Sequence, residues 1–186
     1  ISLNLTKNLN FFVLRDPVLD IFDINNNKNK EEDKDIEKFK DKPFSLSVGR
    51  LTKQKNFIFL IKCFMEIINK DPSQILLIIG DGEDKFNMLK LINKYNLQNN
   101  IYLLGYKKNI FEYMRIAKNI IIPSLWEDPG FVLIESCYFG KNIICSDCKS
   151  GPKEILNYGK NGILFKNNSE EDFIKKFYFL KELNEN

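Results

Sequence analysis

The sequence predicts an α/β fold in which a doubly wound parallel sheet is covered by helices on both faces. From residue 44 onward, short apolar runs alternate with segments of helical period, which is the pattern of consecutive βαβ units. The first helical segment has one apolar face, because its apolar residues recur every three or four positions. The chain has 186 residues, 44% of them hydrophobic, which is enough for one domain with a buried core and some additional chain.

The expected strands and helices alternate along the chain. The strands are expected at residues 44–48, 75–79, 101–104, 119–122, 142–145 and 162–165. The helices are expected at residues 57–69, 86–95, 110–117, 131–139, 153–156 and 170–183. The core-facing side of the first helix is expected to consist of Phe57, Leu60, Ile61, Phe64, Ile67 and Ile68. Parallel strands connected in this way are buried on both faces.

The first 43 residues differ in character from the rest. An apolar run at 11–14 is expected to be extended, and the stretch 25–35 is too polar to bury anything and is expected to be exposed. We therefore expect an interdomain strand and polar linker at 1–43 and a Rossmann-like domain at 44–186. Because the chain begins at Ile1 rather than Met, we expect it to be a piece of a larger protein or a trimmed form.

The composition excludes several classes of function. The chain contains no histidine, which removes Ser-His and Cys-His catalysis and histidine metal sites. The 28 Lys and Arg exceed the 25 Asp and Glu by three, and a net charge of +3 gives no reason to expect nucleic acid. No apolar run reaches the roughly 20 residues of a membrane span, and no signal peptide is visible. The expected location is the cytoplasm.

Neither the cysteines nor a short acidic motif predicts a metal site. Cys145 and Cys148 form a CxxC motif, but no second cysteine pair exists, so one core and one loop cysteine in a reducing compartment are expected. The triplet Asp33-Lys34-Asp35 has the DxD form of a metal–sugar site but lies in a low-complexity polar stretch. We expect no metal.

Ligands of doubly wound sheets bind beyond the carboxyl ends of the strands, so the residues after each run are the candidates. After the first run, Gly49 allows close backbone approach, and Arg50 and Lys55 place two cations at the head of a helix. Arginine offers a bidentate fork and lysine a point charge to phosphate oxygens, so this loop suits a diphosphate. An exposed basic loop without a ligand is the alternative, and the segment alone leaves both open.

The loops after the second and third runs are less informative. The segment Gly80-Asp81-Gly82 has the first two glycines of a GxGxxG motif, but Lys85 occupies the third position. Acidic residues also surround it, so a tight strand-to-helix turn is favoured over a dinucleotide site. After the third run, Tyr106 can stack on a base or be an ordinary surface residue.

The segment after the fourth run is the most informative. Pro129 suits the start of a helix and Gly130 permits close approach, so Glu127 is expected in the preceding loop and Glu135 one to two turns inside the helix. A carboxylate among apolar residues is costly without a partner, which makes Glu135 a candidate to accept ligand hydroxyls. Eight residues of continuous helix rise about 12 Å, which is beyond the separation of a glycosidase pair, but the loop before Pro129 could shorten this distance and leaves that pair open. In the alternative, Glu127 is a solvated loop acid and Glu135 a structural one.

Together these residues resemble the C-terminal, donor-binding domain of GT-B retaining glycosyltransferases, often called group 1 or family 4. The matching segments are Gly49-Arg50-Leu51 with Lys55, Gly80-Asp81-Gly82, Gly105, Pro123-Ser124, Glu127 and Glu135 with seven residues between them, Gly140, the segment 151–155 and the segment 159–162. The resemblance covers residues 44–183, and its specificity lies in the order and spacing of the motifs. In this family the loop that begins with the first glutamate usually reads Glu-Gly-Phe-Gly, whereas this chain has Glu127-Asp128-Pro129-Gly130. The proline at position 129 removes one backbone amide that could donate a hydrogen bond to the donor.

The resemblance implies a role for each matching residue. Arg50 and Lys55 would bind the donor diphosphate and stabilise the leaving nucleotide. Glu127 would contact the transferred sugar, and Glu135 would accept the ribose hydroxyls. Gly49 would lie against the donor. A further group of expected donor contacts is Tyr106 at the base and the backbone amides of Gly130, Phe131 and Val132 at the phosphates.

The implied function is transfer of a sugar from a nucleotide-diphosphate sugar to an acceptor, with retention, in cell-surface polysaccharide or glycoconjugate synthesis. Negative charge builds on the departing diphosphate, and preplaced cations and amides stabilise it, so no metal or other cofactor is expected. The acceptor, a glycan or glycolipid, would bind the absent N-terminal domain. This piece alone is therefore expected to bind nucleotide sugar weakly and to be inactive, and peripheral contact with the inner membrane face is left open for the full-length protein.

Two other interpretations are left open by the residues. The first is a non-enzymatic Rossmann-like module for partner binding or regulation, in which the two cations and two acids need not converge. The second is a sugar-nucleotide epimerase of the same architecture, which usually needs a catalytic histidine. The transferase is distinguished from the non-enzymatic module if four side chains meet at one cleft: Arg50, Lys55, Glu127 and Glu135.

Overall fold

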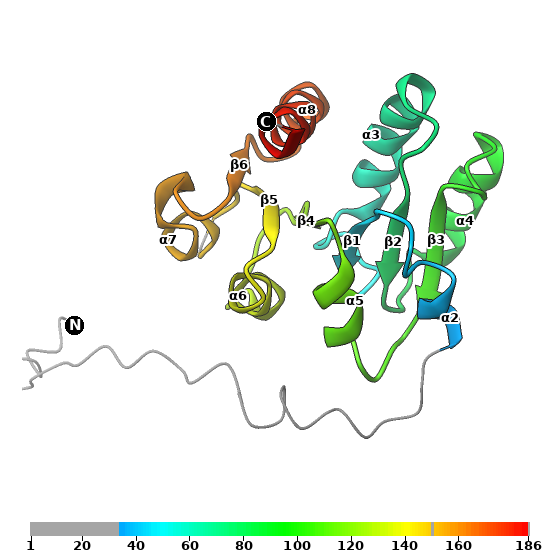
Figure 1. The fold of residues 1–186 in the computed structure, drawn as a ribbon, viewed down its shortest axis with the longest axis horizontal. Coiled ribbons are helices and arrows are strands. Elements are labelled where there is room, and N and C mark those ends of the chain that lie inside the picture. Colours follow the sequence, from blue (N-terminus) through cyan, green and yellow to red (C-terminus); the bar gives the residue numbers. More distant parts are fainter. Residues whose placement is uncertain (1–33, 150, 186) are drawn as a thin grey trace, which may run out of the picture.

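The computed structural model describes residues 34–149 and 151–185, with side-chain burial described as far as residue 183. The extended run expected at 11–14 and the polar stretch up to residue 33 lie outside the described residues. The described chain forms a six-stranded parallel sheet in the order β3-β2-β1-β4-β5-β6, with helices on both faces (Figure 1). The predicted fold class is confirmed.

Every expected strand and helix is present, with bounds that differ by at most two residues at either end. The strands are β1 (Ser45–Val48), β2 (Leu76–Ile79), β3 (Ile101–Gly105), β4 (Asn119–Ile122), β5 (Asn142–Ser146) and β6 (Ile163–Phe165). The helices are α2 (Lys34–Glu37), α3 (Phe57–Lys70), α4 (Lys85–Lys94), α5 (Phe111–Ile116), α6 (Phe131–Tyr138), α7 (Pro152–Ile155) and α8 (Glu170–Glu185), with a short 3-10 turn at Asn157–Gly159.

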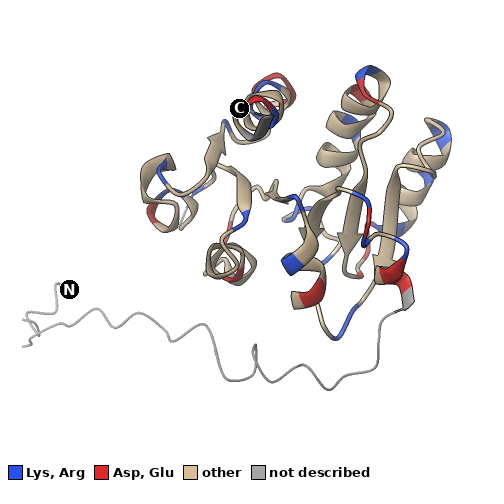
Figure 2. Cartoon of the chain, viewed as in Figure 1, with Lys and Arg blue, Asp and Glu red and all other residues tan. Residues whose placement is uncertain are grey.

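The sheet divides the core into two clusters. One face packs against α3, α4 and α8, and the other against α2, α5 and α6. Alternate strand residues supply the two faces: Leu76 and Ile78 belong to the first cluster, Leu77 and Ile79 to the second. All six core-facing residues predicted for α3 are buried. Figure 2 shows both signs of charge on α3 and α8, in keeping with the small net charge.

The core begins earlier than residue 44. Residues Lys34–Glu37 form α2, and Ile36 and Phe39 are buried in the second cluster with exposed fractions of 5% and 4%. The ring of Phe39 makes edge contacts with Phe44 and Tyr102 at centroid distances of 6.1 and 5.0 Å. The last ten residues of the expected linker are therefore part of the packed domain. Two apolar residues in a highly charged stretch gave too weak a pattern to predict this.

Candidate functional site

The strand order reverses between β1 and β4, which are neighbours in the sheet although three helices separate them in the chain. At such a switch point the connections leave in opposite directions, and a crevice opens beyond the carboxyl ends of the two strands. The loop after β1 carries Gly49, Arg50 and Lys55, and the loop after β4 carries Glu127. The loop with two predicted cations and the loop with a predicted acid thus follow neighbouring strands at the same edge of the sheet.

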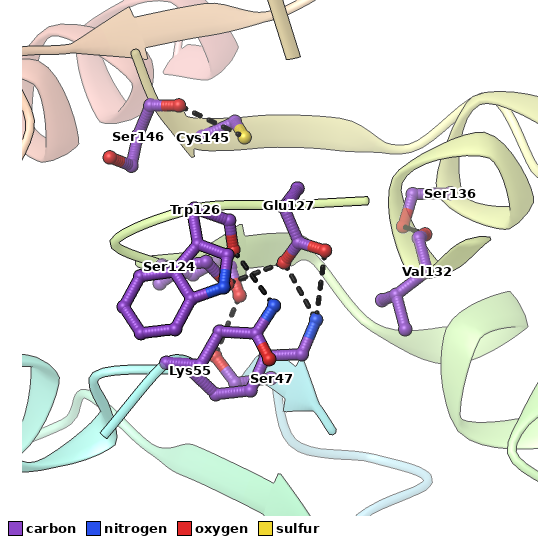
Figure 3. Close-up of polar contacts among 11 residues, drawn as sticks. Ser47, Lys55, Ser124, Trp126, Glu127, Val132, Ser136, Cys145 and Ser146 are labelled. Carbon is purple, nitrogen blue, oxygen red and sulfur yellow. Dashed lines mark hydrogen bonds and ion pairs between the residues drawn. The ribbon is translucent and has the colours of Figure 1, made fainter. Parts of the chain in front are cut away.

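A buried ion pair connects these two loops. The ammonium nitrogen of Lys55 lies 2.7 Å from Oε1 and 2.9 Å from Oε2 of Glu127 (Figure 3). Only 17% of the Lys55 side chain and 5% of the Glu127 side chain are exposed. The hydroxyl of Ser124 donates a further hydrogen bond to Oε1 of Glu127. Glu127 is therefore neither solvated nor isolated, and two of the predicted residues, Lys55 and Glu127, meet directly.

Backbone contacts fix the two loops to each other. The amide of Leu125 donates to the carbonyl of Gln54 at 2.8 Å, and the Gln54 side-chain amide donates to the Trp126 carbonyl at 3.1 Å. From the other side, the side-chain amide of Asn167 donates to the Leu125 carbonyl at 3.0 Å. Since Gln54 adjoins Lys55 and Trp126 adjoins Glu127, these bonds set the spacing at which the ion pair forms.

The first two loops at this edge are interlocked through glycine. A Cβ atom on Gly80 would lie 1.8 Å from the Gly49 carbonyl oxygen, and one on Gly82 would lie 2.5 Å from the Leu51 carbonyl oxygen. The amide of Leu51 donates to the Asp81 carbonyl at 2.9 Å. The prediction of a tight turn after β2 is confirmed, and its glycines serve to seat the loop that carries Arg50 and Lys55.

Helix α6 begins beside Glu127 and carries the second glutamate. Gly130 precedes the helix in the left-handed region, with φ of 81°. The amides of Phe131 and Val132 belong to the first turn, where amides have no acceptor within a helix. Glu135 follows in the second turn, is half-buried, and its buried Oε2 atom has no hydrogen-bond partner among the described residues. Burial raises the pKa of this carboxyl to about 7.

Arg50 and Tyr106 are also at the carboxyl edge, and both are exposed. Tyr106 follows β3 directly, and 78% of its surface is exposed. The amide of Gly80 donates to the Gly105 carbonyl at 2.9 Å, so the start of the Tyr106 loop is held against the loop after β2. Of the predicted residues, Lys55 and Glu127 are in direct contact, and the loops that carry Gly49, Arg50, Tyr106 and Gly130 follow strands at the same edge of the sheet. The remaining three, Phe131, Val132 and Glu135, lie in the first two turns of α6.

Several buried polar atoms in the described residues have no hydrogen-bond partner. Within the described chain, five of the seven such side-chain atoms lie in loops that follow strands, at the end of β5 or on α6: Thr52 Oγ1, Asn109 Oδ1, Glu135 Oε2, Ser146 Oγ and Asn167 Oδ1. Most buried polar groups in folded proteins are hydrogen-bonded. They are spread along the edge, since Asn109 follows β3 and Asn167 follows β6, the two outermost strands, and Glu135 Oε2 is the one that belongs to a predicted donor contact.

Metal-ligand chemistry finds little support in the described residues. They contain no group of three or more potential metal ligands. Cys145 lies in β5 and Cys148 in the following loop, both buried and free, as predicted. Burial raises the pKa of the Cys145 thiol well above its usual value and that of Cys148 to about 11, which disfavours the thiolate form that reacts and binds metals. Of the DxD triplet, Asp33 lies outside the described residues, and Asp35 forms an ion pair with Lys107 at 2.7 Å.

Sequence reasoning gave no role to Ser124 or Gln54 and did not predict the direct pairing of Lys55 with Glu127. The spacing of Ser124, three residues before Glu127 in a loop, was a usable signal because short polar side chains often bond to groups two to four residues away. The contacts of Gln54 depend on how two distant loops meet, which only the fold reveals.

Within the described residues, no helix combines the length and apolar character needed to cross a bilayer.

Comparison with known proteins places the chain in a family. The family model described as glycosyl transferases group 1 matches residues 28–186. The chain is 42% identical, over an alignment of 146 residues, to the uncharacterized glycosyltransferase MJ1059 of Methanocaldococcus jannaschii, and the match covers 72% of this chain and 36% of that protein. It is 35% identical over 136 residues, 73% of its length, to a Campylobacter jejuni enzyme, of which it also covers 36%. That enzyme is named N-acetylgalactosamine-N,N'-diacetylbacillosaminyl-diphospho-undecaprenol 4-alpha-N-acetylgalactosaminyltransferase.

A solved glycosyltransferase structure has a similar fold. The chain superposes on TarM of S. aureus, crystallised as a variant with fondaparinux, α-GlcNAc-glycerol and UDP, with a TM-score of 0.72 and 26% identity. The match covers 76% of this chain and 29% of TarM. The chain thus spans about a third of the length of the relatives it matches. It belongs to the glycosyl transferases group 1 family.

Proposed function

We propose that this chain is the donor-binding part of a GT-B, family 4 glycosyltransferase that transfers a sugar from a nucleotide-diphosphate sugar with retention of configuration. The Lys55–Glu127 pair at the switch point of the sheet carries the proposal. It is supported by family membership and by TarM, whose solved complex contains UDP. The acceptor, a glycan or a lipid-linked glycan, would bind a preceding domain, and the reaction would take place in the cytoplasm or at its membrane face.

Each side chain has a chemical task in this proposal. Lys55 and Arg50 neutralise the diphosphate as the sugar–phosphate bond breaks and charge accumulates on the leaving group. The first-turn amides of Phe131 and Val132 add hydrogen bonds at a helix N-terminus beside Gly130. These groups supply the charge stabilisation that a divalent cation would otherwise give, so the proposal includes no metal.

The two glutamates bind different parts of the donor. Ribose hydroxyls are hydrogen-bond donors, and the unpartnered Oε2 of Glu135 is an acceptor available to them. Glu127 lies beside Lys55, where the transferred sugar would meet the diphosphate, and its carboxylate can accept bonds from sugar hydroxyls. Tyr106, exposed after β3, would contact the base. Arg50, Lys55 and Glu127 are then the residues at the reacting bond.

Calorimetric titration with UDP, GDP and their sugar conjugates tests the proposal. We expect one nucleotide to bind, and Glu135→Ala to weaken it about tenfold through loss of the ribose bonds. Glu66→Ala is the matched control, because Glu66 is an exposed helical glutamate on α3, away from the carboxyl-edge loops. Equal binding by Glu135→Ala and the wild type would contradict the ribose assignment, and binding of no nucleotide would contradict the proposed function. Product analysis by NMR with the full-length enzyme tests retention.

A further inference from the structure

We propose that Ser124 is a positioning residue, whose hydroxyl holds the Glu127 carboxylate in the orientation that presents the Lys55 ammonium to a diphosphate. The inference rests on the proposed function and extends it to a residue outside the expected donor contacts. Ser124 itself is fully buried, so it acts through Glu127 rather than on the ligand.

The contact geometry gives Ser124 a single task. A serine hydroxyl has one proton to donate, and that of Ser124 goes to Oε1 of Glu127, the same oxygen that Lys55 approaches at 2.7 Å. Ser124 and Glu127 are three residues apart in one loop, on the β4 side of the crevice, whereas Lys55 comes from the β1 side. The hydroxyl therefore joins the carboxylate to its own loop, and the carboxylate joins that loop to Lys55.

Hydrogen bonds hold the backbone around Glu127, so the torsions of its side chain are the main part of the loop that can still change. The loop between Ser124 and Glu127 is held at Leu125 and Trp126 by Gln54 and at Leu125 by Asn167. With these backbone atoms fixed, the direction of the carboxylate depends on the torsions of the Glu127 side chain. The Ser124 bond at one oxygen, together with the Lys55 bonds at both, selects one orientation.

This orientation determines what Lys55 can offer a ligand. An ammonium group has three N–H donors, and two of them are directed at Glu127 at 2.7 and 2.9 Å. The third remains for a phosphate oxygen. Without the Ser124 hydroxyl, the buried carboxylate loses one donor and must obtain more from Lys55, because an unsatisfied buried charge is costly. Lys55 would then be turned away from the diphosphate.

The test compares two buried serines. Ser124→Ala removes the hydroxyl at Glu127, and Ser47→Ala is the matched control. Ser47 is also fully buried, lies on β1, and donates to the Ile121 carbonyl at 2.8 Å. The measured quantity is the ratio of UDP affinity to UMP affinity in the 186-residue chain, or of GDP to GMP if the chain selects guanine. This ratio isolates the binding due to the second phosphate from base and ribose binding.

We expect Ser124→Ala to lower this ratio about tenfold while UMP binding stays within twofold of the wild type. Ser47→Ala should leave the ratio unchanged, even if the melting temperature of this variant falls as much as that of Ser124→Ala. Ser124→Thr keeps the hydroxyl and should restore the ratio. If Ser124→Ala lowers the affinities for UDP and UMP equally, or lowers neither affinity, the positioning role is wrong.

A ligand-free measurement separates this inference from the proposed function. The side-chain nitrogen of Lys55, protected in its ion pair, should give a ¹H–¹⁵N ammonium signal that disappears in Glu127→Gln. Ser124→Ala should shift that signal, whereas Ser47→Ala should not. A signal unaffected by Ser124→Ala overturns the inference whether or not any nucleotide binds. Absence of nucleotide binding with the expected signal shift would contradict the proposed function alone.

Discussion

The two glutamates of the site occupy opposite electrostatic situations within one loop and its helix. Glu127 is almost completely buried and has both carboxylate oxygens paired with Lys55, and one of them also with Ser124. Glu135 is half-buried among apolar residues of α6, and one of its oxygens has no partner in the described chain. Burial raises the pKa of the Glu135 carboxyl to about 7.

The paired and the unpaired glutamate therefore contribute differently to the stability of the fold and to ligand binding. A paired carboxylate holds two loops together and keeps a cation in place before a ligand arrives. An unpaired one destabilises the free protein, and a ligand that donates hydrogen bonds relieves that cost on binding. On this view Glu127 belongs to the framework of the site as much as to its chemistry, whereas Glu135 is reserved for the ligand.

The largest effect is expected from removing the partner of the buried glutamate. Lys55→Ala leaves the Glu127 charge buried with only the Ser124 bond, and should lower the free energy of unfolding by about 3 kcal/mol. Urea denaturation at pH 7 measures this. Lys53→Ala is the control, because Lys53 lies exposed in the same loop and should change little. Equal midpoints for the two variants would show that the pair contributes nothing to the framework.

The unpaired glutamate should behave in the opposite way. Because its pKa is raised from 4.5 to about 7, the folded state resists ionisation, so stability is lost as pH rises between these values. Glu135→Gln should therefore stabilise the free chain at pH 8 by about 2 kcal/mol, allowing for partial exposure, and should make no difference at pH 4. Melting curves at both pH values measure this, with Glu66→Gln as control. A variant less stable than the wild type at pH 8 would contradict the assignment.

The same titration should appear in ligand binding. If ribose hydroxyls donate to ionised Glu135, affinity should rise up to about tenfold between pH 6 and pH 8, as the carboxyl loses its proton. A nucleotide-diphosphate sugar is the correct probe, since it lacks the terminal phosphate that titrates near pH 6 in a free nucleotide. Glu135→Gln should abolish the pH dependence. A slope that persists in this variant would assign the titration to another group.

The smallest effect is expected at an exposed pair of similar geometry. Asp81 and Lys85 lie 2.9 Å apart on the surface, and the hydrogen bond from Lys85 lowers the pKa of the Asp81 carboxyl. Solvent screens such pairs, so Asp81→Asn should leave the denaturation midpoint unchanged within error. A loss comparable to that of Lys55→Ala would show that separation, rather than burial, determines the strength of ion pairs in this chain.

How far the sequence predicted the molecule depends on whether a feature is local. The strands and helices followed from alternation and periodicity, as in α3, where all six expected core residues are buried. The position of Glu135 in α6 followed from Pro129 and Gly130 ahead of it. The pairing of Lys55 with Glu127, which are 72 residues apart in the chain, did not follow, because it depends on β1 and β4 being neighbours in the sheet.

Two smaller features were missed for different physical reasons. The inclusion of Ile36 and Phe39 in the core depends on the edge of the sheet that they cover, not on their polar neighbours in the sequence. The contact between Gly80 and the Gly49 carbonyl requires knowing that two loops meet. The predicted glycines were correct as turn residues, but the partner of each turn could be named only from the fold.

A crystal structure of the chain with its preferred nucleoside diphosphate tests the central claim most directly. The account predicts a phosphate oxygen within hydrogen-bond distance of the Lys55 ammonium, a ribose hydroxyl on Glu135, and Glu127 still held by Ser124. A nucleotide bound away from the β1–β4 crevice, with the Lys55–Glu127 pair intact and Glu135 still unpartnered, would contradict it.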